Sequence, residues 1–269
     1  MVQLFSKDVK TMDRNSSKGN QMKWHKEGFW YKADYTGYEG LAEYIVSKLL
    51  HFSNLPNTEY VDYDTEEILY KNRCYLGCRS KNFLPEGWQL ITLERLFQGC
   101  YQKSLYQTIF TIENKEKRLE TLVDYTVRLT GLKEFGVYMS KLLTVDALFL
   151  NEDRHTHNIA VLLDSEGIFH YCPIFDNGAG LMADTSLDYP LTVPLEQLFG
   201  SVSPKTFSGD FDEQLDVAEI LYGKHLKFHF SPKDILRYLE KEGNYSDEIK
   251  ERVFRILLEQ KRKYLYLFE

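Results

Sequence analysis

The sequence predicts an α+β fold in two lobes, a small β-rich amino-terminal lobe over residues 1–82 and a larger, mainly helical carboxyl-terminal lobe over residues 83–269. Strand-like runs rich in aromatic residues dominate the first lobe, whereas helical spacing of apolar residues dominates the second. The chain has 269 residues, of which 43% are hydrophobic, so it is long enough to form two lobes with buried cores.

The amino-terminal lobe is predicted to contain short strands around a single helix. The first two strands are joined by Glu27 and Gly28, a short hairpin connection. The helix covers residues 40–50, where apolar side chains recur at helical spacing, and the Ser-Asn-Leu-Pro sequence of residues 53–56 ends it. The predicted strands are residues 22–26, 29–33, 60–63 and 68–78.

The carboxyl-terminal lobe is predicted to be helical on both sides of one hairpin. Helical spacing is clearest in residues 118–129 and in the apolar residues 135–150, and it resumes at Asp212. The hairpin pairs residues 159–163 with residues 168–172, because the Asp-Ser-Glu-Gly sequence between these apolar runs is typical of a turn.

The charge balance and the distribution of apolar residues exclude two classes of ligand. With 33 basic and 40 acidic side chains the net charge is −7, and the scattered Lys and Arg form no basic stripe for direct nucleic-acid binding. The most apolar segment, residues 135–150, carries Lys141 and Asp146 and is shorter than the roughly 20 residues that span a bilayer. We therefore expect a buried core helix there and no membrane association.

The cysteines and the amino terminus predict a reducing, cytoplasmic location. The chain has no CxxC pair and no His at zinc-finger spacing, and its first residues contain no apolar signal-peptide core. The cysteines are Cys74, Cys78, Cys100 and Cys172.

The richest polar segment is Asn-Glu-Asp-Arg-His-Thr-His-Asn, residues 151–158, between the apolar helix and the hairpin. The hairpin is followed by Asp176, with Gly178 two residues later. Because an antiparallel hairpin returns the chain to the point where it began, we expect Asp176 to lie beside Asn158.

These residues suit phosphoryl transfer from ATP. Protein kinases use an Asp to orient the attacking hydroxyl and, five residues later, an Asn that binds Mg²⁺; Asp153 and Asn158 have this spacing. Asp176 supplies a second oxygen ligand for Mg²⁺. We expect His155 to brace the catalytic loop and His157 to be an exposed bystander.

The reaction also requires a cation on the phosphates, and Lys32 on a predicted strand is the candidate. Helical Glu43 is expected to form an ion pair with this lysine, although Glu39 lies one helical turn earlier and could serve instead. A polar loop ahead of the lysine strand is a candidate phosphate cradle. Its residues are Ser16, Ser17, Lys18 and Gly19.

The Asp-x-His-x-x-Asn pattern of residues 153–158, followed by Asp176, resembles the catalytic and metal-binding elements of HipA-like serine/threonine kinases. The phosphatidylinositol 3- and 4-kinases share the Asp-Arg-His-x-x-Asn form. Residues 42–56 favour the HipA-like family, because they are similar to its Asn-Glu helix and the Gly-Leu-Pro turn that follows. The resemblance extends over residues 14–180.

The sequence departs from the family pattern at three points. Ala42 stands where the family has Asn, and the candidate phosphate loop contains a single glycine, Gly19. We also expect the chain to lack the extra amino-terminal subdomain of full-length HipA toxins, so it resembles the compact bacterial members.

The resemblance implies a two-lobed protein-kinase-like fold and an ATP-dependent serine/threonine kinase with ATP and Mg²⁺ as cofactors. The implied partners are a protein substrate with a Ser or Thr acceptor and a small DNA-binding antitoxin. HipA-like kinases phosphorylate a serine of the phosphate loop, which corresponds to Ser16 or Ser17 here. A competing hypothesis places self-phosphorylation at Ser201, Ser203 or Ser208.

Three other functions remain open. The same fold could phosphorylate a phosphatidylinositol or a small molecule, because the catalytic loop does not contact the acceptor's distinguishing groups. A zinc-dependent hydrolase could use Asp153, His155 and His157 as metal ligands, with His170 as a further ligand. A pseudokinase is disfavoured, because the base, the metal ligands and the lysine are all present.

Overall fold

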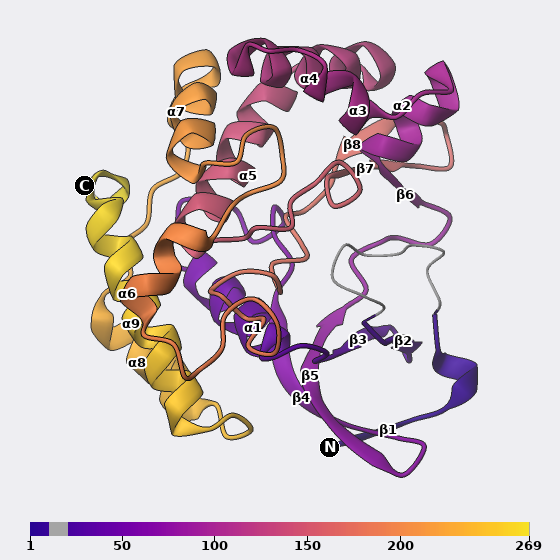
Figure 1. The fold of residues 1–269 in the computed structure, drawn as a ribbon. Coiled ribbons are helices and arrows are strands. Elements are labelled where there is room, and N and C mark those ends of the chain that lie inside the picture. Colours follow the sequence, from indigo (N-terminus) through magenta and orange to yellow (C-terminus); the bar gives the residue numbers. More distant parts are fainter. Residues whose placement is uncertain (11–20, 269) are drawn as a thin grey trace. The chain divides into compact units, whose positions relative to one another are not determined.

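A computed structural model describes residues 1–10 and 21–268 of the chain (Figure 1). The chain forms two compact units, each assembled from segments that are distant in the sequence. The first unit contains Met1–Phe83, Phe175–Val202 and Lys227–Glu269. The second unit contains Leu84–Ile174 and Ser203–Leu226.

The α+β prediction is confirmed, since a β-rich amino-terminal region is followed by a mainly helical carboxyl-terminal part (Figure 1). The predicted boundary between residues 82 and 83 lies one residue before the first crossing from one unit to the other. Residues 175–202 and 227–269 return to the first unit, whereas the sequence assigned them to the second lobe. The functional division into lobes stays a prediction.

The sheet of the first unit has the strand order β1-β4-β5-β3-β2, with β1 parallel to β4 and the other pairs antiparallel. The β2–β3 hairpin turns at Glu27 and Gly28, whose positive φ angles of 52° and 80° suit a two-residue connection. The strands are β1 Val2–Leu4, β2 Lys23–Lys26, β3 Phe29–Ala33, β4 Tyr63–Tyr70 and β5 Arg73–Lys81.

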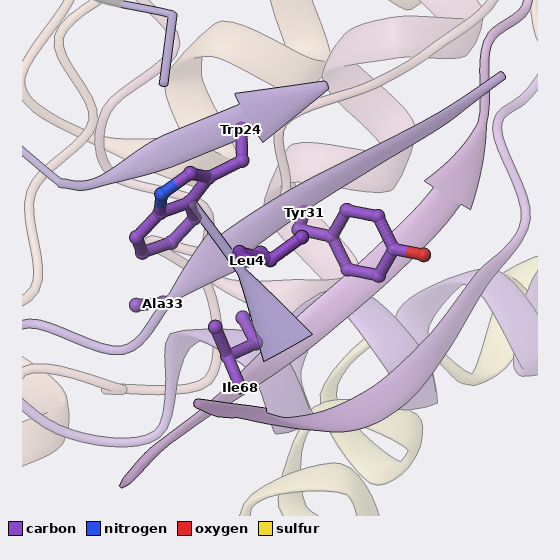
Figure 2. Packing of buried hydrophobic residues seen from close by; sticks show 5 residues of the cluster. All are labelled: Leu4, Trp24, Tyr31, Ala33 and Ile68. Carbon is purple, nitrogen blue, oxygen red and sulfur yellow. The ribbon is translucent and has the colours of Figure 1, made fainter. Parts of the chain in front are cut away.

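One face of this sheet carries an apolar cluster formed by four strands (Figure 2). Tyr31 and Ala33 contribute to it together because alternate residues of a strand point to the same face. Trp24 of β2 is completely buried there. The members drawn in Figure 2 are Leu4, Trp24, Tyr31, Ala33 and Ile68.

Helix α1 (Glu39–Leu50) packs against β4 and β5. Its first turn lies directly on the sheet, because a Cβ atom placed on Gly40 would be 2.5 Å from the carbonyl carbon of Gly77. Glycine at position 40 therefore permits contact between the backbones of α1 and β5. The other helices of the first unit are η1 Ser6–Asp8, α6 Leu195–Leu198, η2 Phe199–Ser201, α8 Pro232–Lys241, α9 Asp247–Lys263 and η3 Leu265–Phe268.

The second unit has its own antiparallel sheet, in the order β6-β7-β8. Helix α5 (Phe135–Phe149) is buried along most of its length, as its apolar sequence predicts. The predicted hairpin is confirmed, with Val161 opposite Tyr171 and Leu163 opposite Phe169. The remaining elements are β6 Gln89–Thr92, β7 Ala160–Leu163, β8 Phe169–Tyr171, α2 Leu93–Tyr101, α3 Leu105–Phe110, α4 Lys115–Thr130 and α7 Phe211–Tyr222.

Two predicted strands have the wrong boundaries. The run predicted over residues 68–78 is two strands, because Lys71 and Asn72 adopt positive φ angles of 48° and 61° and reverse the chain between β4 and β5. The run predicted over residues 60–63 is the approach to β4, which begins at Tyr63. A turn of Lys-Asn without glycine is a weak sequence signal, so the hairpin was read as one strand.

Across the ranges 1–10 and 21–268, the structure contains no helix that is both long enough and apolar enough to cross a bilayer.

Candidate active site

Part of the candidate site lies within the first unit, where Lys32 of β3 meets two carboxylates. Its Nζ atom is 2.5 Å from Oε1 of Glu43 on α1 and 2.5 Å from Oδ1 of Asp176. The side chain of Lys32 is 12% exposed, and that of Glu43 is 1% exposed. Three residues that the sequence nominated separately are thus brought together.

The structure distinguishes between the two candidate glutamates. Glu43 uses its second oxygen, Oε2, to accept the backbone N–H of Asn177 at 2.8 Å, so it contacts both the lysine and the segment that carries Asp176. Glu39 instead accepts the backbone N–H of Thr36 at 2.8 Å, at the start of α1. Glu43 is therefore the partner of Lys32, and Glu39 stabilises the turn into the helix.

The two carboxylates keep Lys32 charged. Burial alone would lower the pKa of this lysine, but the negative charges of Asp176 and Glu43 outweigh burial and raise the pKa well above its usual value. One cation between two carboxylates leaves a net negative charge, which suits the binding of a divalent cation with oxygen ligands.

Asp176 has a backbone conformation that few non-glycine residues adopt. Its φ angle is +61°, in the left-handed region, and this conformation accompanies its contact with Lys32. The following segment is held to the start of α1, because Tyr38 donates its hydroxyl to the carbonyl of Leu181 at 2.7 Å and its N–H to that of Ala183 at 3.1 Å. The segment that follows Asp176 is therefore anchored to the start of α1.

The other part of the candidate site is the loop of residues 151–158 in the second unit. Helix α5 ends at Leu150, whose φ of +54° turns the chain into the loop. Inside the loop, Arg154 donates from Nε to both carboxylate oxygens of Asp146 at 3.1 Å, and from Nη2 to Oδ1 at 3.1 Å. Asn151 donates to the same carboxylate at 2.9 Å. The loop is thus anchored to the last turns of α5.

Further contacts fix the loop along its length. Arg154 donates from Nη1 to the carbonyl of Asn158 at 3.2 Å, which closes the loop on itself. Its own carbonyl accepts the hydroxyl of Thr206 at 2.6 Å. Thr156 donates to the buried carboxylate of Glu94 at 2.7 Å. These contacts hold Asp153, His155 and Asn158 in a defined arrangement within the second unit.

Asp153 is the proposed base of this loop, and three side chains approach it. Asn158 donates from Nδ2 to the Asp153 carbonyl at 2.8 Å, which leaves the amide oxygen of Asn158 as the atom that suits a cation. The Nζ atom of Lys205 is 3.3 Å from Oδ1 of Asp153. The Nε2 atom of His155 is 3.8 Å from Oδ2.

His155 fits the bracing role that the sequence predicts. Burial lowers its pKa, an effect partly opposed by the Asp153 carboxylate, so the ring is neutral at pH 7. Its Nδ1 atom accepts the backbone N–H of His157 at 3.2 Å, which leaves the ring proton on Nε2, facing Asp153. His157 itself is exposed.

Several predicted site features belong to different units or fall outside the described residues. Asp176 belongs to the first unit and Asn158 to the second, so their predicted joint binding of Mg²⁺ stays a prediction. His170 bonds to Asp164 at 2.7 Å in the β7–β8 hairpin, and among residues 1–10 and 21–268 no group of three or more His, Cys, Asp or Glu is arranged to hold a metal ion. The predicted phosphate-loop residues Ser16, Ser17, Lys18 and Gly19 lie outside the described residues.

The alternative self-phosphorylation sites are engaged in local hydrogen bonds. Ser208 is buried and donates its hydroxyl to Glu213. Ser203 donates to the carbonyl of Gly209 at 2.8 Å, and Ser201 to that of Leu198 at 2.7 Å. Ser208 would have to leave its buried position to accept a phosphate.

The sequence does not predict the contacts of Lys205 and Thr206 with the loop of residues 151–158, or the ion pair of Arg154 with Asp146. An Asp inside the apolar helix α5 was a signal, because a buried carboxylate requires a partner, and Arg154 supplies it. Lys205 and Thr206 reach the loop from 47 or more positions along the chain, and no local pattern marks them.

Comparison with known proteins was made on sequence and on structure. No protein-family profile matches the chain, and no curated protein matches it. The chain is similar to the crystal structure of a proinflammatory kinase of Helicobacter pylori, CtkA, with a TM-score of 0.60 and 15% sequence identity. The match covers 99% of this chain and 95% of that chain, so it shows a kinase-like fold along nearly the whole chain.

Proposed function

We propose that this protein is an ATP- and Mg²⁺-dependent protein serine/threonine kinase of the HipA-like type. The observation that carries the proposal is the contact of Lys32 with both Glu43 and Asp176 at 2.5 Å. A partly buried, charged lysine is a point charge suited to phosphate oxygens, and a glutamate that fixes it is the arrangement that kinases use. The kinase-like fold supports the same reading.

Each residue has a distinct proposed role. Asp153 accepts the proton of the acceptor hydroxyl, and His155 holds the loop that carries it. Lys32 binds ATP phosphate oxygens, while Glu43 orients Lys32. The oxygens of Asn158 and Asp176 hold Mg²⁺, which when bound neutralises charge on the phosphates.

The donor chemistry suits this cation. Mg²⁺ prefers carboxylate and carbonyl oxygens, and it is bound in kinases by one or two carboxylates together with substrate phosphates. The net negative charge around Lys32 and the amide orientation of Asn158 fit these preferences. Zinc would instead require several imidazole or thiolate ligands.

The acceptor is proposed to be a Ser or Thr hydroxyl of a protein, and a small DNA-binding antitoxin is the proposed regulatory partner. A phosphatidylinositol or a small molecule is the alternative acceptor on the same fold. Self-phosphorylation is proposed at Ser16 or Ser17. There a phosphate would add about −1.5 to −2 charge beside the triphosphate and oppose ATP entry.

The roles of the two aspartates can be separated by mutation. Asp153→Ala should abolish phosphoryl transfer and keep MgATP affinity within about threefold, because this carboxylate contacts the acceptor. Asp176→Ala should weaken MgATP binding by about tenfold or more, because it removes a metal ligand. Calorimetric titration of the full chain with MgATP, together with mass spectrometry of the products, measures both effects.

Asp62→Ala is the matched control for Asp176→Ala, because Asp62 is also a carboxylate of the first unit and lies 2.8 Å from a lysine, Lys48, on the surface. It should leave MgATP affinity unchanged. Equal affinity losses in the Asp153 and Asp176 variants would contradict the assigned roles. Acceptor tests with Ser/Thr peptides and with phosphatidylinositol vesicles decide between the two acceptor classes.

A further inference from the structure

We propose that Lys205 is a further catalytic residue of this site, which binds the non-bridging oxygens of the phosphoryl group during its transfer. The inference rests on the proposed kinase function. Its Nζ atom is 3.3 Å from Oδ1 of Asp153, the proposed base, and both residues belong to the second unit. The side chain of Lys205 is 38% exposed, against 11% for Asp153, so a ligand can reach it from solvent.

The segment that follows Lys205, residues 206–208, is fixed by hydrogen bonds to its surroundings. Thr206 is buried and donates its hydroxyl to the carbonyl of Arg154 at 2.6 Å. The next residue, Phe207, is also buried, and its carbonyl accepts Nη1 of Arg118 at 2.9 Å. Lys205 is therefore a partly exposed residue that directly precedes a well-anchored segment, and this segment holds its backbone beside the loop of residues 151–158.

The carbonyl of Ser208 completes this anchoring, because it accepts Nε2 of Gln214 on α7 at 2.6 Å. The segment thus contacts α4 through Arg118, the catalytic loop through Arg154, and α7 through Gln214. Ordering this segment costs conformational entropy. A solvated surface ion pair between Lys205 and Asp153 would stabilise the fold by only about 0–1 kcal/mol. A binding role for the lysine accounts for this placement better than surface stabilisation does.

The geometry places Lys205 within reach of the transferred group. A hydroxyl donating to Asp153 has its oxygen about 2.7 Å from the carboxylate, and the reacting phosphorus lies about 3–3.5 Å beyond that oxygen. A cation 3.3 Å from the same carboxylate can therefore reach the phosphoryl oxygens by rotating its flexible side chain.

In the reaction, the acceptor oxygen forms a bond to the γ-phosphorus of ATP as the bond to the β-γ bridging oxygen breaks. The electron pair of the broken bond leaves with ADP, and the hydroxyl proton passes to Asp153. Lys205 keeps its proton throughout. Its charge stabilises the oxygens that become more negative in the transition state, which is where electrostatic catalysis is strongest.

Kinetics of Lys205→Met test the proposal. The kcat for transfer should fall about 10²–10³-fold while the KM for MgATP stays within about threefold, because the cation acts on the transferring group. Lys205→Arg keeps the charge and should recover most of the rate. Affinity for MgADP with aluminium fluoride, a mimic of the transferring group, should fall in Lys205→Met while affinity for MgADP alone stays unchanged.

Lys224→Met is the matched control, since Lys224 lies 3.3 Å from the carboxylate of Glu219, the same separation as in the Lys205–Asp153 pair. Lys224 follows α7 in the chain, whereas Lys205 precedes it. The helix is about 18 Å long, and the segments that carry the two lysines adjoin its opposite ends. The control should change kcat by less than about twofold.

A readout independent of activity is the titration of His155 by NMR. Burial lowers the pKa of His155, the Asp153 carboxylate raises it, and the positive charge of Lys205 lowers it again. The pKa of His155 should therefore rise in Lys205→Met and stay unchanged in Lys224→Met. An unchanged value in Lys205→Met would overturn the placement of the lysine beside the catalytic loop.

The outcomes separate the two proposals. If the wild-type protein transfers phosphate and Lys205→Met does so at a rate within threefold, the role of Lys205 is refuted and the kinase function stands. If the wild-type protein does not bind MgATP, the kinase function itself is refuted, and the phosphoryl-binding role falls with it.

Discussion

Lys32 in the first unit and Arg154 in the second are both cations held by carboxylates, but they are held in opposite ways. Lys32 is 12% exposed and contacts carboxylates from two different segments, Glu43 and Asp176. Arg154 is 1% exposed and directs Nε and Nη2 at a single carboxylate, Asp146. One cation is accessible at the edge of a site, and the other lies completely inside its unit.

The difference shows that a buried ion pair alone does not identify a functional cation. The guanidinium of Arg154 is committed to Asp146 and to a loop carbonyl, so its charge fixes the shape of the loop of residues 151–158. The ammonium of Lys32 is a compact point charge that can exchange one carboxylate for a phosphate oxygen. Accessibility and exchangeable partners therefore separate the two roles.

The largest expected effect on stability is at the buried ion pair of Asp146 and Arg154. Asp146→Ala leaves the charge of Arg154 buried without its carboxylate, which should lower the free energy of unfolding by about 3–5 kcal/mol. Urea denaturation measures the loss. The double variant Asp146→Leu with Arg154→Met removes both charges and should be more stable than Asp146→Ala. A loss below about 1 kcal/mol in Asp146→Ala would contradict the claim that the Arg154 ion pair stabilises the fold more than the Lys32 ion pairs do.

Lys32→Met should act mainly on function. Transfer should fall by about 10²-fold or more, because the cation on the phosphates is lost. Stability should fall by only about 1–2 kcal/mol, because Glu43 keeps the N–H of Asn177 and Asp176 is partly exposed. Initial-rate assays and urea denaturation of the same preparation give both values.

The pH dependence of the Lys32 variant provides a second check. The pKa of Lys32 is raised in the folded protein, so its ion pairs contribute stability below the unfolded pKa and lose it only as the pH rises through the folded value. The stability difference between wild type and Lys32→Met should therefore be constant from pH 7 to about 10. A difference that vanishes near pH 8 would contradict the ion pairs.

The substitution with the smallest expected effect on stability at pH 5 is at Asp34, a carboxylate of the first unit that lies two residues after Lys32. Burial, with a contribution from Glu39, raises the pKa of Asp34 to about 7, although the hydroxyl of Tyr245 donates to it at 2.7 Å. Because the folded pKa lies above the unfolded one, the folded state holds a proton that the unfolded chain releases at about pH 4. Stability should thus fall by about 3 kcal/mol as the pH rises from 4 to 7.

Asp34→Asn removes this dependence on pH and should remain about as stable as the wild type at pH 5. Thermal or urea denaturation over pH 4–8 measures the slope. Asp62→Asn, at a half-exposed carboxylate, is the control and should leave the slope unchanged. An equal slope in wild type and Asp34→Asn would show that Asp34 is already ionised at pH 5.

The sequence predicts the elements whose structure depends on neighbouring residues, such as an apolar helix or a hairpin with a short turn. The apolar residues of α5 can be buried only as a core helix, and Asp-Ser-Glu-Gly marks the β7–β8 turn. Strand β1 was missed because it has only three residues and pairs with β4, which lies more than 60 positions later. Strand β6 was missed because its partner β7 is about 70 positions away.

The same distinction holds at the candidate site. Lys32, Glu43 and Asp176 could be nominated because each stands next to a recognisable element, and the structure brings the three together. The partner of Lys32 could not be chosen from the sequence, because Glu39 and Glu43 share a helical face. Lys205 could not be found, because its approach to Asp153 depends on the folded path of a distant segment.

The contact between Gly40 and Gly77 has a consequence for the conformational populations of the protein. Glu43 lies one helical turn after Gly40, so its distance to Lys32 is set where two backbones touch with no side chain between them. Unlike Lys32→Met, a displacement of α1 would break the hydrogen bond from the N–H of Asn177 to Glu43 and the backbone packing at Gly40, as well as the ion pair. The combined cost is about 3 kcal/mol or more, which corresponds to a population below about 1%. Movement of helix α1 is therefore poorly suited to regulate activity, and the Lys32–Glu43 ion pair is expected to be present before any nucleotide binds.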